Sequence, residues 1–575
     1  MAEDSRGTVR PGQAELFSVI QAPGTSPPDA GRPVADQRGR RPRWQRHLSA
    51  AAVLVLAGCL LFLCFLRLSL SVPENSDGAA NALQAWDLLH GNLLLHGWVL
   101  SDVSFYTTEL PEYALIEAWR GLGPQVVNLA GALTYTLLVL AAALLAKGSA
   151  TGREGWVRAL IAGGIMLVPQ LGAGVGVLLL QPDHVGTTVP VLAAWLLIDR
   201  GGRGRWVPPA VGLLLAWALA ADQVVLYLGI APLLLVSLLR TYKLFFQYRR
   251  AARAAWYELS LAGAAVAATF AGLAVPVIVR AAGGYVVSPA PRALVAGSGL
   301  GPHFWLVVQG VLLLFGADFV GLTASLRTGL VFAHLIGAGL AGWAVWLGWR
   351  RFFRDADWIV QLLTLGIITI TAAYFLGQTA RDVPDVHEMA AVLPFGAVLA
   401  GRLLAGRLWS ARLVPLLGAV LAVYLAGLGV DLATASPSTS AQALPRWLSA
   451  HRLSYGLGPY WSSASVTLAS GGQVRVLALS GGAHLHGYGW ETKVSWYDPR
   501  KHVAGFVLLC PVPAGLYQAP PVRSPAVYQA FGRPARVYRA DGCRVLVYDY
   551  NLLTRLSLRG QRGQLIARWP PSRLP

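Results

Sequence analysis

The chain has 575 residues, of which 55% are hydrophobic and only 13% are charged. A soluble domain carries about 25% charged residues, so this composition excludes an ordinary soluble enzyme. The net charge of +19 comes mostly from arginines in short loops between apolar runs. That placement indicates membrane topology and argues against a nucleic-acid partner.

Residues 1–47 are polar and basic, and we expect them to form a disordered cytoplasmic tail. After them, apolar runs of about 20 residues recur, and in lipid such runs satisfy their backbone groups only as helices. We therefore predict a mainly α, polytopic transmembrane domain over 48–431 with about eleven spans. The predicted spans are 48–72, 124–146, 157–180, 186–198, 207–221, 224–240, 257–281, 327–349, 358–376, 388–401 and 413–430.

The loops between these spans alternate in charge. One set is rich in arginine and lysine, and by the positive-inside rule it should face the cytoplasm. The other set is acidic and should face outward. With the N-terminus inside and eleven spans, the C-terminal region lies outside the plasma membrane. The basic loops fall at 41–46, 147–158, 200–205, 240–253, 350–354 and 402–412, and the acidic ones at 73–123, 183, 222 and 381–388.

One apolar segment, residues 303–323, does not fit this alternation. Counted as a span, it would place Arg350, Arg351 and Arg354 on the outside. We therefore interpret it as an interfacial or re-entrant helix on the outer side.

The longest loop, 73–123, is acidic and aromatic and too apolar for a free linker. Asp77 follows the first helix at the lipid boundary, where partial desolvation raises a carboxyl pKa toward that of a general base. Its alternative role is a helix cap or a solvated loop charge. Asp102 and Glu109 in the same loop favour a functional role, with Asp102 as a second catalytic candidate and Glu109 as a substrate-binding one.

Further ionisable residues stand at the ends of later spans, and such residues at membrane depth are functional candidates. For His184 alone, a hydrogen-bonded loop residue is the simpler interpretation, since an Asp–His pair without a third ligand is weak support for a metal site. Arg381 is suited to a lipid phosphate or to a neighbouring aspartate. The substrate-binding candidates are Asp183, His184, Asp222, Arg381 and Glu388.

Hydropathy falls after Asp431, where residues 432–443 are typical of a linker. Residues 444–575 alternate predicted strands and helices, which favours a small extracytoplasmic α/β domain. Its aromatic residues suit either core packing or sugar stacking. Cys510 ends one predicted strand and Cys543 begins another, so they could form a disulfide across neighbouring strands in an oxidising compartment. The predicted strands are 473–479, 504–510, 535–540 and 543–550, and 524–532 is a predicted helix.

The layout resembles the GT-C class of integral membrane glycosyltransferases: a first helix, a long acidic outer loop, short paired spans and an outer C-terminal domain. The segments SDGAANALQAWDLLHGNLLLHGW, SFYTTELPEYALIEA and LPFGAVLAGR are also similar to a group of multi-pass bacterial membrane proteins. The GT-C resemblance implies a catalytic acid in the first outer loop, which corresponds to Asp77, and an acidic residue in the second, which corresponds to Asp183. The sequence departs from the class because its first loop lacks two adjacent acids.

The resemblance implies transfer of a hexosyl or pentosyl group from a polyprenyl-phosphate sugar to a cell-envelope glycan or protein. Either an arginine or a divalent cation would neutralise the phosphate, and the sequence leaves that choice open. Membrane lipid and the lipid-linked sugar are the expected partners. A transporter or lipid flippase, or a scaffold without catalysis, are the alternatives. The sequence has no clear internal repeat, and its charges gather at the ends of the spans. Both features favour an enzyme over a transporter.

Overall fold

The structure is a computed structural model that describes residues 43–569 apart from 181–183, 248–254, 290–292, 355–356, 379, 411, 439–441, 482–483 and 512–520. The predicted disordered tail, 1–47, therefore falls almost entirely outside the described residues. So does Asp183.

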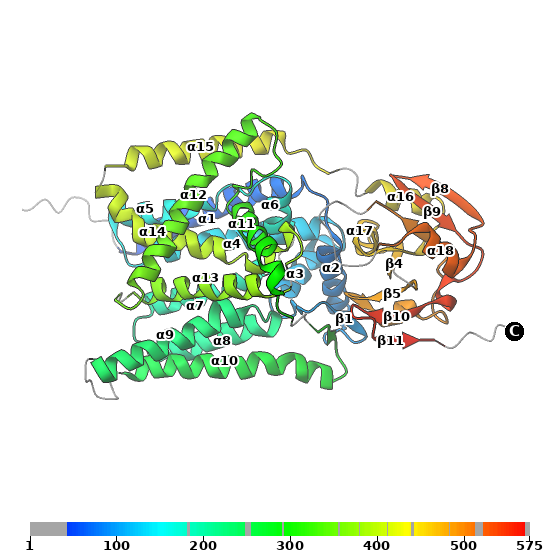
Figure 1. Cartoon of the computed structure of the whole chain (residues 1–575), viewed down its shortest axis with the longest axis horizontal. Helices are drawn as coiled ribbons and strands as arrows, with labels where there is room; N and C mark the ends of the chain where they lie inside the picture. The colour runs from blue at the N-terminus through cyan, green and yellow to red at the C-terminus, as the bar shows by residue number, and fades with distance from the viewer. Residues whose placement is uncertain are drawn as a thin grey trace, which may run out of the picture. The chain divides into compact units, whose positions relative to one another are not determined.

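The first part of the described chain is almost wholly helical, as its apolar runs predict (Figure 1). The helices are α1 (Arg43–Ser69), α2 (Ser76–Leu89), α3 (Glu109–Arg120), α4 (Gln125–Lys147), α5 (Gly152–Ile165), α6 (Ala173–Val175), α7 (Val185–Arg200), α8 (Val207–Ala221), α9 (Ala231–Tyr242), α10 (Trp256–Ala281), α11 (Leu300–Leu314), α12 (Leu326–Arg351), α13 (Trp358–Leu376), α14 (Val392–Ser410) and α15 (Val414–Thr434). Large apolar side chains such as Trp195, Tyr135 and Phe395 are buried between them.

Nine helices in the described part of the chain are long and apolar enough to cross a membrane, so this is a multi-pass membrane protein. Eight of them overlap predicted spans. The predicted spans 157–180, 186–198 and 207–221 contain shorter helices, and the ninth long helix, Gly297–Leu314, lies where no span was predicted.

The predicted span 157–180 is interrupted. The α5 helix ends at Ile165, and a non-helical stretch containing Pro169 and Gly172 precedes α6. Exposed backbone groups are costly within a membrane, and the side chain of Gln170 in this stretch satisfies two of them in the turn after α11. Gln170 donates through Nε2 to the carbonyl of Asp318 (2.7 Å), and its Oε1 accepts the amide of Asp318 (3.0 Å).

The segment predicted to be re-entrant forms α11 and the turn after it. His303, near its start, contacts the carbonyls of Phe375 and Ala380 at the end of α13 and beyond it. Phe315, just after α11, contacts His334 within α12 through its carbonyl (3.2 Å). A helix that enters the bundle and returns on the same side accounts for both contacts, so re-entry remains our proposal for this segment.

The long loop 73–123 is structured. Asn75 caps α2 by accepting the amide of Gly78 (2.9 Å). A side chain at Gly78 would meet Val127 Cγ1 at 2.8 Å, which explains the glycine at this crossing. Three short strands then tie the loop to distant segments. β1 (Trp98–Leu100) pairs in parallel with β2 (Val286–Val287) and antiparallel with β6 (Thr492–Lys493).

Within the residues that the structure describes, the C-terminal region is an eight-stranded mixed sheet with three helices, an α/β arrangement as predicted. The strand order is β11-β10-β5-β4-β3-β7-β9-β8. Its strands are β3 (Tyr455–Pro459), β4 (Arg475–Ser480), β5 (His486–Gly489), β7 (Phe506–Leu509), β8 (Arg536–Ala540), β9 (Cys543–Val547), β10 (Ser557–Gly560) and β11 (Leu565–Arg568), and its helices are α16 (Ala443–Ala450), α17 (Tyr460–Ala469) and α18 (Ser524–Phe531).

Cys510 and Cys543 form a disulfide in this sheet. The antiparallel strands β7 and β9 pair Leu509 with Arg544, so the two cysteines stand opposite each other one residue further along. The strand register therefore brings the sulfur atoms together without displacing the backbone.

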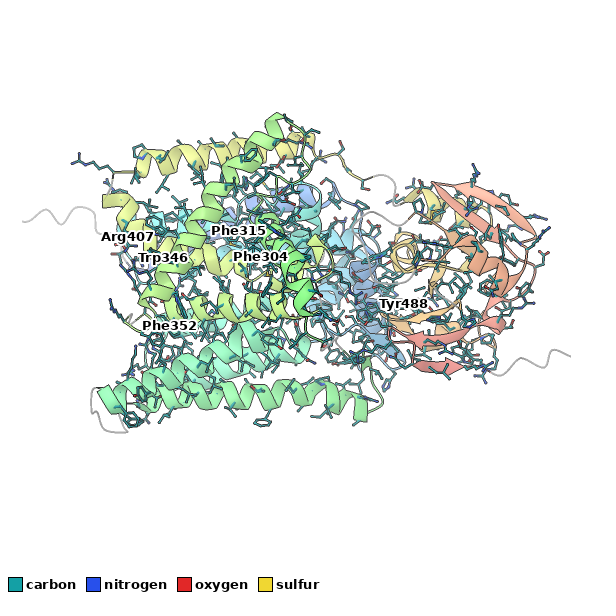
Figure 2. All side chains as sticks on the ribbon, viewed as in Figure 1. Phe304, Phe315, Trp346, Phe352, Arg407 and Tyr488 are labelled. Carbon is teal, nitrogen blue, oxygen red and sulfur yellow. A yellow bond between two sulfur atoms is a disulfide. The ribbon has the colours of Figure 1, made fainter. Side chains whose placement is uncertain are left out.

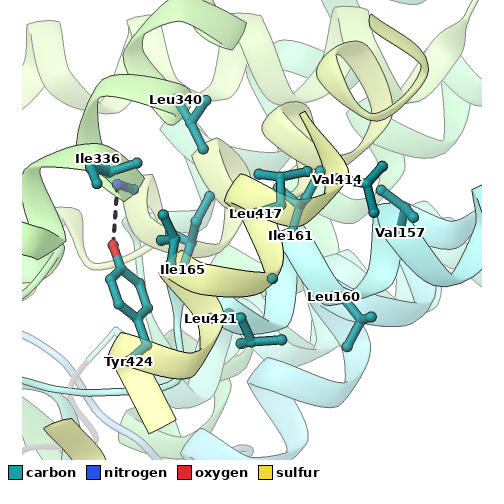
Figure 3. A pocket seen from close by; sticks show the side chains of 14 residues that line it. Val157, Leu160, Ile161, Ile165, Ile336, Leu340, Val414, Leu417, Leu421 and Tyr424 are labelled. Atoms are coloured by element: carbon teal, nitrogen blue, oxygen red, sulfur yellow. Dashed lines mark hydrogen bonds between the residues drawn. The ribbon is translucent and has the colours of Figure 1, made fainter. Parts of the chain in front are cut away.

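An apolar cavity of about 160 Å³ lies among α5, α12 and α15 (Figure 3). Glycines 164, 337 and 418 leave room in its wall, and the Tyr424 hydroxyl accepts the amide of Gly337 (3.2 Å) at one end. Its lining contains no acid, base or histidine. This cavity therefore offers no side chain for general acid–base catalysis at neutral pH.

Candidate active site

Asp77 lies in the first turn of α2 and is buried. Its Oδ1 accepts a hydrogen bond from the hydroxyl of Tyr460, the first residue of α17. Ser76 strengthens the same contact, since its hydroxyl donates to the backbone carbonyl of Tyr460 (2.5 Å). The C-terminal region thus supplies the residue that holds the predicted catalytic carboxylate.

Tyr460 also connects Asp77 to a second carboxylate. Its hydroxyl oxygen lies 2.9 Å from Oε2 of Glu491, in the turn between β5 and β6. Glu491 is buried and has a φ of 45°, a left-handed conformation that is uncommon for a residue with a side chain.

Tyr488 stands beside this pair, with its ring edge-on to that of Tyr460 at 5.5 Å. Its hydroxyl is buried and has no hydrogen-bond partner among the described residues. Burial raises the pKa of Tyr488, and the charges of Asp77 and Glu491 raise it further. Arg381 opposes them and Asp102 adds to them. Tyr488 is therefore within electrostatic reach of four charged groups from separate segments.

Asp102 follows β1 and is half-buried. Burial raises the pKa of Asp102, whereas His184 lowers it and Asp222 raises it. Asp102 thus interacts both with Tyr488 and with the His184–Asp222 pair, and it joins the two halves of the site.

His184 and Asp222 form a buried pair, although 38 residues separate them. His184 Nδ1 lies 2.6 Å from Oδ2 of Asp222, which also accepts the hydroxyl of Thr187 (3.0 Å). The amide of Val224 donates to the other Asp222 oxygen (2.9 Å). An aspartate that accepts a hydrogen bond from Nδ1 favours the tautomer with the proton on Nδ1. The second functional nitrogen, Nε2, is then directed away from Asp222.

A second imidazole, that of His387, stacks on His184 at 5.4 Å. Burial and the neighbouring His184 lower the pKa of His387 to about 3, against the effect of Asp222. His387 is therefore neutral at physiological pH. Its Nδ1 is buried and lacks a hydrogen-bond partner within the described chain, so it remains able to contact a ligand.

The remaining predicted residues fall in different places. Glu109 is 0% exposed beneath the first turn of α7, where a side chain at Gly186 would overlap its carboxylate. Arg381 is exposed and reaches the cluster electrostatically. Glu388 interacts electrostatically with Tyr374. The structure thus supports a packing position for Glu109.

These contacts define what we call the polar cluster: Asp77, Asp102, His184, Asp222, Arg381, His387, Tyr460, Tyr488 and Glu491. Five of its members were candidates from the sequence. Sequence reasoning placed His387 in the outer segment 381–388 without giving it a role, and it missed Tyr460, Tyr488 and Glu491. An acid beside aromatic residues in GYGWETK was the only available signal, and it is equally typical of a core turn.

No group of three His, Cys, Asp or Glu side chains within the described ranges is arranged to hold a metal ion. The groups that could neutralise a phosphate in the polar cluster are Arg381 and the imidazole of His184. Together with a buried carboxylate, they could accept a proton from one ligand and stabilise negative charge on another.

No family model matches the sequence, and no curated protein does. Two solved structures match the fold over nearly their whole length, both of ArnT from Cupriavidus metallidurans. The apo structure has a TM-score of 0.53 at 14% identity and covers 89% of this chain and 99% of that one. The structure bound to undecaprenyl phosphate has a TM-score of 0.52 at 12% identity, with 88% and 99% covered. The fold is therefore GT-C-like, as predicted.

Proposed function

We propose that the chain is a membrane glycosyltransferase that moves a sugar from a polyprenyl-phosphate donor to a cell-envelope acceptor on the outer face of the plasma membrane. The observation that carries this proposal is the buried carboxylate of Asp77, held by Tyr460 within the polar cluster. The ArnT structure with undecaprenyl phosphate supports a lipid phosphate as the carrier on this fold.

The reaction needs a base for the acceptor and positive charge for the leaving group. Asp77 takes the proton of the acceptor hydroxyl while the oxygen of that hydroxyl forms a bond to C1 of the sugar. The bond between C1 and the phosphate oxygen breaks, and the polyprenyl phosphate leaves with the electron pair. Arg381 and His184 stabilise the negative charge on that phosphate. The same scheme can use a divalent cation in place of Arg381. Removing metal ions from the assay tests this alternative.

The donor and acceptor sites follow from the two halves of the cluster. The His184 half, with His387, suits the phosphate of the donor, and Arg381 would approach that phosphate from beside Tyr488. The Asp77 half, where the Tyr488 hydroxyl lacks a partner among the described residues, suits hydroxyl groups of the sugar or acceptor. Asp102 interacts electrostatically with both halves and is assigned to orient the acceptor.

The test is Asp77→Asn in the full-length protein, assayed by transfer of label from a polyprenyl-phosphate sugar in membranes. Asparagine keeps the shape and removes the base, so transfer should fall by roughly 10²–10⁴-fold. Protein level and membrane insertion should be unchanged. The control is Glu112→Gln on α3, whose carboxylate accepts the hydroxyl of Thr134 (2.7 Å) away from the cluster and whose loss should matter far less.

Two other outcomes redirect the proposal. Full activity in Asp77→Asn with loss in Asp102→Asn would move the base to Asp102 within the same cluster. If the wild-type protein consumes no lipid-linked sugar, the enzyme proposal fails, and a transporter or a scaffold replaces it.

A further inference from the structure

The Asp77–Tyr460–Glu491 contact contains more acceptors than protons. The Tyr460 hydroxyl has one proton, yet its oxygen is within hydrogen-bond distance of a carboxyl oxygen on each side. A phenol can donate that proton to only one of them. The second contact is a hydrogen bond only if the other carboxyl group is protonated and donates to the Tyr460 oxygen, so the three side chains together hold one extra proton.

We infer that Glu491 holds this proton, and that Tyr460 and Glu491 relay protons away from Asp77 during transfer. The inference rests on the proposed function. If Asp77 held the extra proton, it could not accept one from an acceptor hydroxyl. With Glu491 protonated, the chain runs from Glu491 to the Tyr460 oxygen and from the Tyr460 hydroxyl to an ionised Asp77.

The relay conserves protons over one turnover. Asp77 gains the proton of the acceptor hydroxyl as the new glycosidic bond forms. Asp77 then donates to the Tyr460 oxygen, the Tyr460 proton passes to Glu491, and the proton that Glu491 held goes to water. One proton enters at Asp77 and one leaves at Glu491. Asp77 is then ionised again, and Tyr460 and Glu491 each hold one proton, which is the starting state.

The surrounding structure places Glu491 for this task. Glu491 directly precedes β6, which pairs with β1, so the same short sheet positions Glu491 and the loop carrying Asp102. Its left-handed conformation is one that glycine adopts at no steric cost. A buried glutamate that keeps such a conformation is typical of a position at which the side chain itself is needed.

Three variants of the full-length chain separate a relay from a packing role. Glu491→Gln keeps the shape and an amide donor for the Tyr460 oxygen but cannot release a proton. Glu491→Gly removes the side chain and relieves the left-handed backbone. Tyr460→Phe removes the hydroxyl between the carboxyl groups. Each should lower kcat by about ten- to hundredfold, with KM for donor and acceptor within about twofold of wild type. Glu491→Asp, which retains a carboxyl group, should recover part of kcat.

The matched control is Asp541→Gly, which changes another acid with a left-handed backbone (φ 49°) in the same region, exposed and outside the cluster. It should leave kcat unchanged. Melting temperature is measured for all variants, and Glu491→Gly should not melt below wild type if its effect is on proton transfer.

The results distinguish the two proposals. A wild-type kcat in Glu491→Gln, with Asp77→Asn inactive, would overturn the relay and leave the proposed function standing. A rise in KM with a lower melting temperature in all three variants would also overturn it in favour of packing. Wild-type activity in both Asp77→Asn and Glu491→Gln would remove the proposed base itself.

Discussion

Glu117 places a carboxyl group inside the protein next to the apolar face of α3. It is 2% exposed, and neither carboxylate oxygen has a hydrogen-bond partner among the described residues. Burial raises its pKa from 4.5 to about 9, so the folded protein keeps this group protonated at neutral pH. The unfolded chain ionises it above about pH 4.5. Because the folded-state pKa is the higher one, this contribution to stability is complete below pH 4.5 and declines as the pH rises toward 9.

Glu117→Gln should therefore remove the pH dependence that Glu117 adds to the free energy of unfolding. Glutamine is neutral at every pH, so the variant should melt higher than wild type at pH 8 and nearly together with it at pH 5. The difference in unfolding free energy at pH 7 should be at most about 3.5 kcal/mol, from about 1.4 kcal/mol for each pH unit above the unfolded-state pKa of 4.5. Thermal unfolding in detergent across this pH range measures it, and Glu154→Gln, an exposed position on α5, is the control. Parallel pH profiles for Glu117→Gln and wild type would contradict the assignment.

At the scale of helices, Arg402 joins four of them. Its guanidinium is 5% exposed and contacts Asp199 of α7 (2.5 Å) and Asp357 at the start of α13 (2.9 Å). Its Nε donates to the carbonyl of Leu145 on α4 (2.8 Å). Arg402 itself belongs to α14 and closes the segment LPFGAVLAGR, so the structure gives that segment a physical role in holding the helix ends together.

Arg402→Met should destabilise the helix bundle strongly. It leaves two partly buried aspartates without their cation, and breaking a buried ion pair on one side costs roughly 3–5 kcal/mol. Folded yield and melting temperature in detergent measure the loss. Adding Asp199→Asn and Asp357→Asn to the same variant should restore much of it. The exposed Arg412 provides the control, since Arg412→Gln should have little effect, and an Arg402→Met protein as stable as wild type would refute the role.

At the scale of the whole chain, the basic loops and the polar cluster belong to different ends of the helices. Figure 2 shows Arg407 at one end and Tyr488 beside the C-terminal strands at the other. Arg402, with its partners Asp199 and Asp357, belongs to the basic set of loops. By the positive-inside rule, we propose that the polar cluster and the disulfide-bonded sheet lie outside.

Cysteine labelling in intact cells tests this orientation. Cys59 and Cys64 are replaced by alanine, and the disulfide is kept. A membrane-impermeant thiol reagent should then label Ser438→Cys and miss Gly202→Cys, which lies in an exposed turn of a basic loop. Gly202→Cys should label once the membrane is dissolved, which proves that its thiol is reactive. The opposite pattern in intact cells would invert the topology and with it the proposed location of the reaction.

The sequence by itself determined which segments are helical in the membrane and that an α/β region follows them. Apolar runs and loop charges report the local environment of each segment, so α4, α10, α13 and α15 lie close to their predicted spans. The pairing of Cys510 with Cys543 was also within reach, because each cysteine adjoins a strand and the two strands are neighbours. Asp77, Asp102, His184 and Asp222 could be selected because acids and imidazoles are rare near membrane depth.

Only the tertiary structure decided how these groups meet. Gln170, in the break after α5, pairs with Asp318, a contact between segments 148 residues apart. Tyr460 reaches Asp77 across 383 residues, and Glu491, which precedes the strand that pairs with β1, contacts the same tyrosine. Hydrophobic periodicity measures how each segment faces its surroundings, whereas these contacts depend on the packing of separate elements. A tyrosine at the start of α17 and a glutamate in the turn before β6 therefore carry no local mark of the contacts that they make around Asp77.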